Sequence, residues 1–197
     1  MKCTVLFGSP RREGNTAALL CPFMEELSAL GVEVDRIGLY DRTIKPCLGC
    51  MTCQDCLDEL GCVQEDDFAD VFRAMEGSDL LVFATPIYAW YCTAPMKALA
   101  DRAIYAGNKN YGRTRGAAML AGKAVATLVT CGYPAEKGAD LWIEGLKRWC
   151  KHGKMNYLGD FCHRDLGRGV PFLKKEDEGK VREFARKLVS PYIQEEA

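Results

Sequence analysis

Residues 2–16 read KCTVLFGSPRREGNT, a short apolar run that passes directly into a polar turn with two glycines. Further runs rich in Val, Ile, Leu and Phe occur at residues 80–85, 123–130 and 155–161, and a weaker, alternating pattern occurs at residues 32–39. Continuous apolar runs of this length are typical of strands that are buried on both faces of a parallel sheet. The sequence therefore predicts five strands, the first of which ends at a glycine-containing loop.

Segments with helical periodicity lie between these runs. Their apolar residues recur every three or four positions, and they cover residues 15–30, 68–77, 95–104, 141–149 and 181–189. Alternating strands and helices predict an α/β fold, in which right-handed crossovers cover both faces of a parallel sheet. Ligands bind such sheets outside the carboxyl ends of the strands. The loops that follow residues 7, 85 and 130 are therefore the expected binding site.

The length and composition of the chain restrict its class. With 197 residues, 48% of them hydrophobic, and no repeat or linker, we expect one domain over residues 1–197. The near balance of 26 basic and 27 acidic side chains argues against nucleic acid as a partner. No apolar run approaches the roughly 20 residues that cross a membrane, and the N-terminus lacks a secretory-signal pattern. We therefore expect a cytoplasmic protein with no membrane partner.

The turn at residues 8–16 has the composition of an anion-binding loop. Its glycines allow a tight turn that exposes backbone amides, and the start of the following helix adds unpaired N–H groups. The residues expected to hold a phosphate are Ser9, Arg11, Gly14, Asn15 and Thr16. The loop matches neither G-x-x-x-x-G-K-[ST] nor G-x-G-x-x-G, which disfavours a nucleoside triphosphate or a dinucleotide. The alternative is an ordinary polar turn capped by Asn15 or Thr16.

Aromatic side chains gather after the third apolar run, where Tyr88, Trp90 and Tyr91 follow the sequence Thr85-Pro86-Ile87. Aromatic faces can stack on a planar ring while loop amides bond its polar edge. Core packing is the alternative explanation for such residues. Because a predicted anion loop follows the first strand, the two loops together favour a flavin.

Three motifs resemble a known family: G-S-P-R-x-x-G-N-T at residues 8–16, T-P-I-Y at 85–88 and P-x-K-x-x-x-D-R at 95–102. They are similar to the flavodoxin-like flavoproteins related to NADPH-dependent FMN reductases and iron–sulfur flavoproteins. The resemblance extends roughly over residues 2–162. It implies a three-layer, doubly wound sheet of strand order 2-1-3-4-5, with the FMN phosphate in the first loop. It also implies that the flavin ring lies against Pro86, Ile87, Tyr88, Trp90, Thr130, Cys131 and Gly132.

The same resemblance implies the chemistry. FMN would take hydride from NAD(P)H and pass electrons to a small-molecule or protein acceptor, so no catalytic side chain is expected. Family members commonly form homodimers or homotetramers. Two functions of other classes remain as alternatives: an electron-transfer protein without nicotinamide activity, and a non-enzymatic zinc-binding module.

Five of the eleven cysteines fall in a loop at residues 45–65, and they are Cys47, Cys50, Cys53, Cys56 and Cys62. In a reducing compartment such a group indicates metal, iron–sulfur or redox chemistry, and serial C-x-x-C steps are typical of [4Fe–4S] ligands. The resemblance implies Cys47, Cys50 and Cys53 as three ligands, with Cys56 or Cys62 as the fourth. Cluster-free relatives keep a similar segment ahead of an Asp-Asp pair, so free thiols and structural zinc are alternatives.

Three further expectations concern charged residues. Asp67 is the expected N-cap of the helix that begins near residue 68. Asp101 and Arg102 are expected to form a local ion pair. The basic stretch at residues 109–115 is interpreted as a solvated loop, with steering of the NADPH 2′-phosphate as the alternative.

Overall fold

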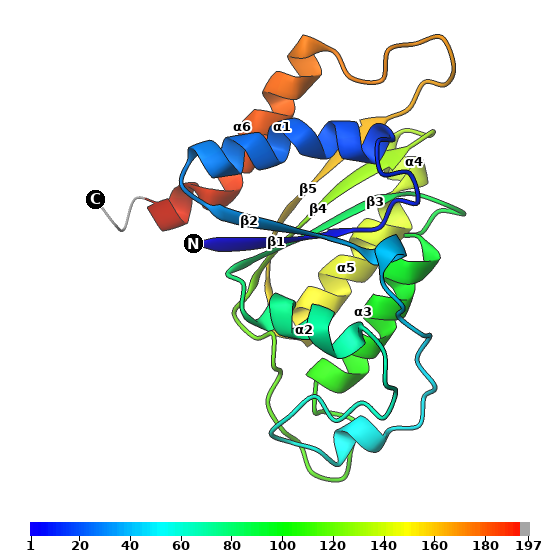
Figure 1. Ribbon diagram of the computed structural model, residues 1–197, viewed down its shortest axis with the longest axis vertical. Coiled ribbons are helices and arrows are strands. Elements are labelled where there is room, and N and C mark those ends of the chain that lie inside the picture. The colour runs from blue at the N-terminus through cyan, green and yellow to red at the C-terminus, as the bar shows by residue number, and fades with distance from the viewer. Residues whose placement is uncertain (194–197) are drawn as a thin grey trace.

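The computed structural model describes residues 1–193 and contains a five-stranded parallel sheet (Figure 1). Its strands are β1 (Lys2–Phe7), β2 (Glu33–Gly38), β3 (Leu80–Pro86), β4 (Ala124–Cys131) and β5 (Asn156–Arg164). They lie in the order β2-β1-β3-β4-β5, and each neighbouring pair is parallel. The predicted α/β fold and strand order are confirmed.

Helices cover both faces of the sheet, which gives three layers (Figure 1). One face carries α1 (Asn15–Ala29) and α6 (Lys175–Ile193), and the other carries α2 (Phe68–Glu76), α3 (Ala94–Gly107) and α5 (Asp140–His152). Short helical turns complete the described elements: η1 (Leu39–Asp41), η2 (Thr52–Gln54) and α4 (Ala135–Gly138). Within residues 1–193, no helix combines the length and the apolar character needed to cross a bilayer.

Alternate residues of the central strands enter two separate cores. On β3, Leu81 and Phe83 pack with α2, α3 and α5, whereas Val82 and Ala84 pack with α1 and α6. Successive side chains of a strand point to opposite faces, so a strand covered on both faces must be apolar throughout. This explains why the residues of β3 are all buried.

The last helix is longer than its apolar periodicity predicts. The buried residues Val181, Ala185, Leu188 and Val189 lie in the predicted segment, but α6 begins at Lys175. Its first turns are polar and are stabilised by local charges, including an ion pair of 2.7 Å between Lys180 and Glu176. Pairs of this kind stabilise a helix without any apolar signal.

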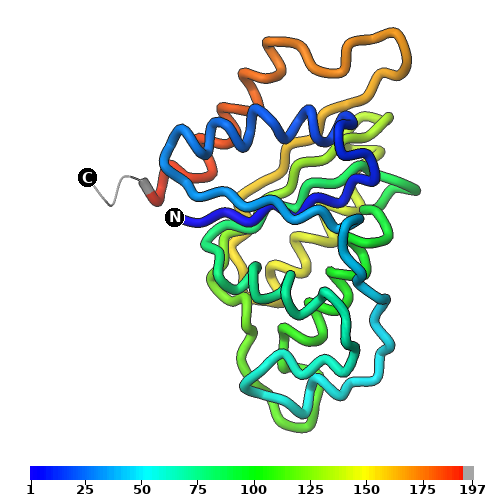
Figure 2. The backbone as a smooth tube through the Cα atoms, in the orientation of Figure 1, coloured from blue at the N-terminus to red at the C-terminus, as the bar shows by residue number. Residues whose placement is uncertain are grey.

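Two loops far apart in sequence lie side by side below the sheet (Figure 2). One is the cysteine-rich loop between η1 and α2, and the other follows α3. The side chain of Gln54 joins them, because its Nε2 donates to the carbonyl oxygen of Asn108 (3.1 Å) and its Oε1 accepts from the amide of Tyr111 (2.9 Å). The cysteine-rich loop is thus held against the segment after α3.

Candidate functional site

Three loops meet at the carboxyl ends of β1, β3 and β4. The Gly8 amide donates to the carbonyl of Ala84 (2.8 Å), and the Thr93 hydroxyl donates to the carbonyl of Gly8 (2.6 Å). From β4, Thr130 accepts a hydrogen bond from the Ile87 amide on its carbonyl oxygen (2.8 Å). The structure therefore brings together the three segments in which the sequence predicts the flavin residues.

The loop after β1 leaves the start of α1 without a side-chain cap. Gly14 is the N-cap residue and has no side chain to accept a hydrogen bond, and the Thr16 hydroxyl instead contacts the Thr130 hydroxyl (2.9 Å). Asn15 is also engaged elsewhere, because its Nδ2 donates to Asp165 (2.8 Å). The alternative of a turn capped by Asn15 or Thr16 is therefore wrong. Uncapped amides at a helix N-terminus can receive an anion.

The predicted phosphate residues Ser9 and Arg11 lie in this loop with different exposure. Ser9 is buried, and its Oγ accepts from the Arg11 amide (3.2 Å). The Arg11 side chain is exposed, and no ion pair is recorded for it within residues 1–193. Its neighbour Arg12 differs, because it pairs with Asp41 at 2.5 Å. Arg11 is thus the loop arginine with an uncommitted guanidinium in the described structure.

The aromatic loop after β3 is a tight turn of unusual backbone conformation. Tyr88 and Tyr91 exchange backbone hydrogen bonds of 2.9 and 3.0 Å, and the two residues between them, Ala89 and Trp90, have φ values of 49° and 62°. A two-residue turn with positive φ at both positions is normally formed by Asn-Gly or Gly-Gly, and each residue in this region costs about 1 kcal/mol or more. The turn holds the Trp90 side chain outward, 52% exposed.

A cleft of about 150 Å³ lies between the second and third loops. Its lining includes Ile87, Trp90, Cys131, Gly132 and Tyr133. The rings of Trp90 and Tyr133 are nearly parallel, with planes 16° apart and centroids separated by 6.5 Å. An apolar cleft beside aromatic faces suits a planar ligand.

Cys131 lies in this cleft close to a second cysteine. Its Sγ is 3.3 Å from the Sγ of Cys162 and 2.9 Å from the carbonyl oxygen of Tyr133. Burial raises the pKa of the Cys162 thiol far above its ordinary value, with Cys131 adding to the effect. Cys162 is therefore a thiol at neutral pH, as expected for a cysteine in apolar surroundings.

Four of the five loop cysteines border one enclosed, mostly apolar pocket of about 20 Å³. They are Cys47, Cys50, Cys53 and Cys62. The sulfur of Cys56 lies instead against Gly61, where an added Cβ would come within 2.8 Å of it. In the described part of the chain, no three His, Cys, Asp or Glu side chains are grouped so as to hold a single metal ion.

The thiols of this loop differ in their electrostatics. Hydrogen bonding by Thr52 lowers the pKa of the exposed Cys50 thiol. Burial raises the pKa of Cys53, against the opposing influence of Gln54 and Lys109. Thiolate is the form that binds metal, so the lowered pKa of Cys50 favours that form, whereas burial disfavours it at Cys53.

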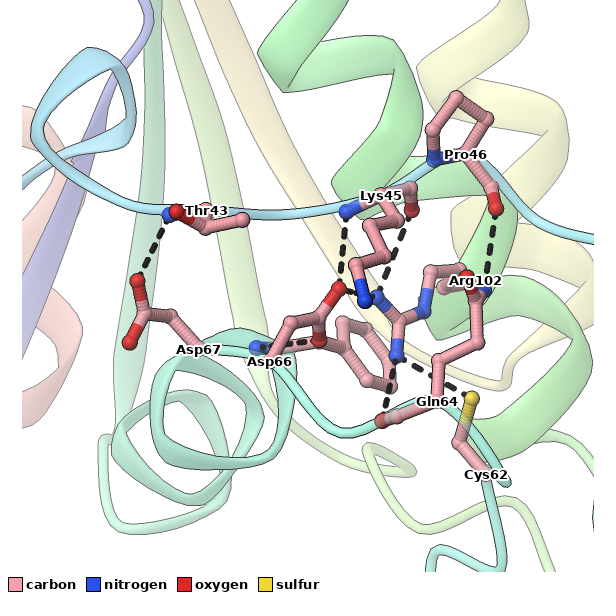
Figure 3. A network of polar contacts seen from close by, with 9 residues as sticks. Thr43, Lys45, Pro46, Cys62, Gln64, Asp66, Asp67 and Arg102 are labelled. Carbon is pink, nitrogen blue, oxygen red and sulfur yellow. Dashed lines mark hydrogen bonds and ion pairs between the residues drawn. The ribbon is translucent and has the colours of Figure 1, made fainter.

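Arg102 joins the cysteine loop to the start of α2 (Figure 3). Its Nη1 contacts Asp66 Oδ2 at 2.5 Å, and both side chains are 1% exposed. Its Nη2 donates to the Sγ of Cys62 (3.2 Å), and the guanidinium lies over the Phe68 ring at 4.1 Å. The Nε of Arg102 is buried without a hydrogen-bond partner. Arg102 also borders the four-cysteine pocket, so this unpaired donor belongs to the same site.

These contacts correct one expectation and refine another. Asp101 pairs with Lys97 (2.6 Å) on the exposed side of α3 and Arg102 pairs with the distant Asp66, so the expected local ion pair of Asp101 with Arg102 is wrong. Asp67 is the N-cap residue of α2, as expected, but its side chain makes no capping hydrogen bond, because its carboxylate accepts from the Thr43 amide (2.6 Å). The partners of Asp66 and Asp67 depend on which loops meet in space.

The pKa of Asp66 reflects opposing effects. Burial alone would raise it, but the hydrogen bond from Arg102 and those from the amides of Lys45 and Phe68 outweigh burial and lower the pKa of this carboxyl. Asp66 is therefore ionised at neutral pH and neutralises the charge of Arg102.

Lys109 is also placed differently from the sequence interpretation. It is completely buried, and its Nζ donates to the carbonyl oxygens of Cys53 (2.9 Å) and Leu60 (3.0 Å). Burial lowers the pKa of Lys109, while the neighbouring Cys53 opposes the change. The expectation of a solvated loop holds for Arg113 and Arg115, which are exposed, and is wrong for Lys109.

The fold and the three-loop cleft define a flavodoxin-like α/β protein. Residues 1–162 match the family model described as NADPH-dependent FMN reductase. The chain belongs to this family.

Curated iron–sulfur flavoproteins are among the similar proteins. The chain is 37% identical over 109 residues to an iron–sulfur flavoprotein of Archaeoglobus fulgidus, covering 55% of this chain and 48% of that protein. It is 28% identical over 163 residues to the iron–sulfur flavoprotein of Methanosarcina thermophila, covering 83% and 80%. The match to the Archaeoglobus protein thus spans about half of its length.

The solved structure of an NAD(P)H:quinone oxidoreductase from Methanothermobacter marburgensis has the same fold. The TM-score is 0.75 at 18% identity, and the alignment covers 95% of this chain and 96% of that one. At this level of identity the likeness establishes the architecture, in agreement with the sheet order described above.

Proposed function

We propose that this protein is an FMN-dependent oxidoreductase that transfers hydride from NAD(P)H to the flavin and passes electrons to a small-molecule or protein acceptor. The observation that carries the proposal is the meeting of an uncapped helix N-terminus with an aromatic-lined cleft at the carboxyl edge of the sheet. A phosphate at one end and a planar ring at the other match the two halves of FMN. Membership of the FMN reductase family supports the same ligand.

The chain's own residues bind and orient the cofactor in this proposal. The first amides of α1, with Ser9 and Arg11, receive the phosphate, and the Thr16–Thr130 contact holds the start of α1 against β4. Trp90 and Tyr133, whose rings are nearly parallel, line the cleft that receives the flavin ring. Bound FMN would supply hydride acceptance and one-electron release, which side chains cannot perform.

We further propose that the cysteine loop holds a [4Fe–4S] cluster through Cys47, Cys50, Cys53 and Cys62. These four thiols border one pocket, whereas Cys56 does not. The unpaired, buried Nε of Arg102 at the same pocket is a donor without an acceptor, and cluster sulfur is an acceptor. The names of the relatives support an iron–sulfur centre in this branch of the family.

Spectra and iron content test both parts of the proposal. Anaerobically purified protein is expected to show flavin absorbance near ~450 nm, broader absorbance near ~400 nm and about four irons per chain. Cys62→Ala is expected to lose the iron, and Cys56→Ala, the matched control, is expected to retain it. Iron loss in Cys56→Ala alone would assign the fourth ligand to Cys56. Zinc in place of iron, with no flavin retained, would favour the zinc-binding module.

Rapid mixing with NADPH or NADH separates an enzyme from an electron carrier. Flavin bleaching within seconds is the result expected of an oxidoreductase. A flavin that stays oxidised with both nucleotides but is reduced by dithionite would contradict the nicotinamide step and favour the electron-transfer alternative.

A further inference from the structure

The segment after α3 inserts a lysine into the base of the cysteine-rich loop. Lys109 has no exposed surface, and its ammonium contacts two backbone carbonyls of that loop, those of Cys53 and Leu60. These carbonyls lie on either side of Cys56 in the sequence. The positive charge is therefore inside the loop that carries the four pocket cysteines, and it is shielded from solvent.

The ammonium has no carboxylate partner in the described structure. Within residues 1–193, no Asp or Glu oxygen lies within 4.0 Å of the Lys109 Nζ. The buried carboxylate of the region, Asp66, is paired with Arg102. A buried charge without a close counter-ion is unfavourable. Glu59 acts on the ammonium electrostatically but forms no ion pair with it in the described structure, so a negative group bound within the loop would stabilise Lys109.

A [4Fe–4S] cluster bound by four thiolates is such a group. Four thiolates outweigh the charge of the oxidised iron–sulfide core, so the bound cluster is negative overall, and it becomes more negative when it accepts an electron. Arg102 supplies a hydrogen bond to Cys62, but its charge is already neutralised by Asp66. Lys109, which comes from the segment after α3, is a buried cation at this loop with no carboxylate in contact within residues 1–193.

We infer that Lys109 is the counter-charge of the cluster and raises its reduction potential, an inference that rests on the iron–sulfur part of the proposed function. The reduced cluster carries the larger negative charge, so a nearby fixed positive charge stabilises it more than the oxidised cluster. Lys109 is thus a redox-tuning residue that acts on the cluster without ligating it.

The test compares charge removal at Lys109 with charge removal on the protein surface. Lys109→Gln keeps N–H donors for the two carbonyls but removes the charge, and Lys109→Met removes both. Arg113→Gln is the matched control, because it removes a positive charge from an exposed position of the same segment. The readout is a redox titration of the reduced cluster by electron paramagnetic resonance.

At the midpoint potential of the wild-type cluster, both Lys109 variants are expected to show a ratio of reduced to oxidised cluster about tenfold lower than that of wild type. Arg113→Gln is expected to show the wild-type ratio. A wild-type ratio in Lys109→Gln would overturn the inference, because hydrogen bonding alone would then explain the lysine. A shift in Arg113→Gln as large as that in Lys109→Gln would also overturn it.

Iron content and folding decide the case in which the Lys109 variants hold no cluster. Iron-free variants that keep the circular dichroism and melting temperature of iron-free wild type, yet fail to take up the cluster, support the counter-charge role. Iron-free variants that fail to fold overturn it in favour of a structural role. Wild-type protein that binds FMN but no iron would refute the cluster proposal itself, and this inference with it.

Discussion

Two neighbouring arginines show how single residues with the same chemistry acquire different roles. Arg12 is paired with Asp41, whereas the exposed Arg11 has no ion pair in the described structure. Both precede the uncapped start of α1. Sequence alone predicted Arg11 as the phosphate contact from its place in the motif. The structure adds that Arg12 is already engaged.

We expect Arg11→Ala to weaken FMN binding about 10- to 100-fold, because a charged hydrogen bond contributes roughly 1.5–3 kcal/mol. Riboflavin, which lacks the phosphate, should bind almost as well as to wild type. Fluorescence titration of both flavins measures the difference. Arg12→Ala is the control and should leave FMN binding nearly unchanged. Equal losses for the two flavins in Arg11→Ala would contradict the phosphate role.

The Asp66–Arg102 pair is the second residue-scale feature with a measurable consequence. Removing one partner of a buried pair leaves the other charge unpaired, so Asp66→Asn should lower the free energy of unfolding by about 3–5 kcal/mol. Asp70→Asn breaks the exposed pair with Arg73 and should change it by less than about 1 kcal/mol. Chemical denaturation of both variants makes the comparison, and similar losses would refute the distinction.

The Asp66 carboxylate also makes the free energy of unfolding depend on pH. The pKa of Asp66 is lowered in the folded protein, so its stabilising contribution is complete above the unfolded-state value of about 3.9 and is lost as the pH falls through the folded-state value. Wild type should therefore lose stability below about pH 4 more steeply than Asp66→Asn. Denaturation at a series of pH values tests this, and parallel curves would contradict it.

Individual elements show where local propensity and tertiary contact compete. Helix α6 extends beyond its apolar stripe through polar turns, and Gly179 lies in its exposed part. Helix α5 contains Gly145, where an added Cβ would come within 2.6 Å of the Tyr91 hydroxyl. Gly179 therefore affects stability only through its low helix propensity, whereas Gly145 leaves space for Tyr91 of the aromatic loop.

Gly179→Ala should raise the free energy of unfolding by about 1 kcal/mol, since nothing lies within 4 Å of the added methyl group and alanine favours the helix. Gly145→Ala should give no such gain, and it should weaken FMN binding by displacing Tyr91. Thermal melts and flavin titration measure the two effects. Stabilisation by both substitutions, with unchanged flavin affinity, would contradict the role of Gly145.

At the scale of the whole molecule, the candidate cofactor site depends on the assembled sheet. Its three loops come from strands that are separated by long stretches of chain and become neighbours only in the folded state. The cysteine loop likewise depends on the segment after α3. A ligand that contacts all three flavin loops therefore binds the folded protein and not the unfolded chain.

FMN at a hundredfold excess over its dissociation constant should raise the free energy of unfolding by about 2.7 kcal/mol. The melting temperature should therefore increase with FMN concentration. Riboflavin at the same concentration should give a smaller increase, because it does not engage the start of α1. A melting temperature independent of FMN, in protein whose spectrum shows bound flavin, would contradict a site formed only on folding.

The strands, the α/β class and the three loops expected to bind the cofactor could be predicted from local patterns along the chain. The spacing of apolar residues along a strand or helix depends on which of its faces are buried, so these elements can be identified from short stretches of sequence. The glycine loop and the T-P-I-Y segment directly follow predicted strands, so their place at the binding edge of the sheet could be predicted in the same way. The strand order followed from the family resemblance and agrees with the structure.

The partners of the charged and sulfur-containing side chains depend on long-range contacts in the folded chain and could not be predicted from local patterns. Arg102 pairs with Asp66 rather than with its neighbour, Lys109 is buried beneath the cysteine loop, and Cys62 borders the pocket that Cys56 does not. Asp165, which binds Asn15 from beyond β5, had no sequence signal at all. The reason is physical: a long-range ion pair or shared pocket depends on which loops the sheet brings together, and no periodicity along the chain encodes that.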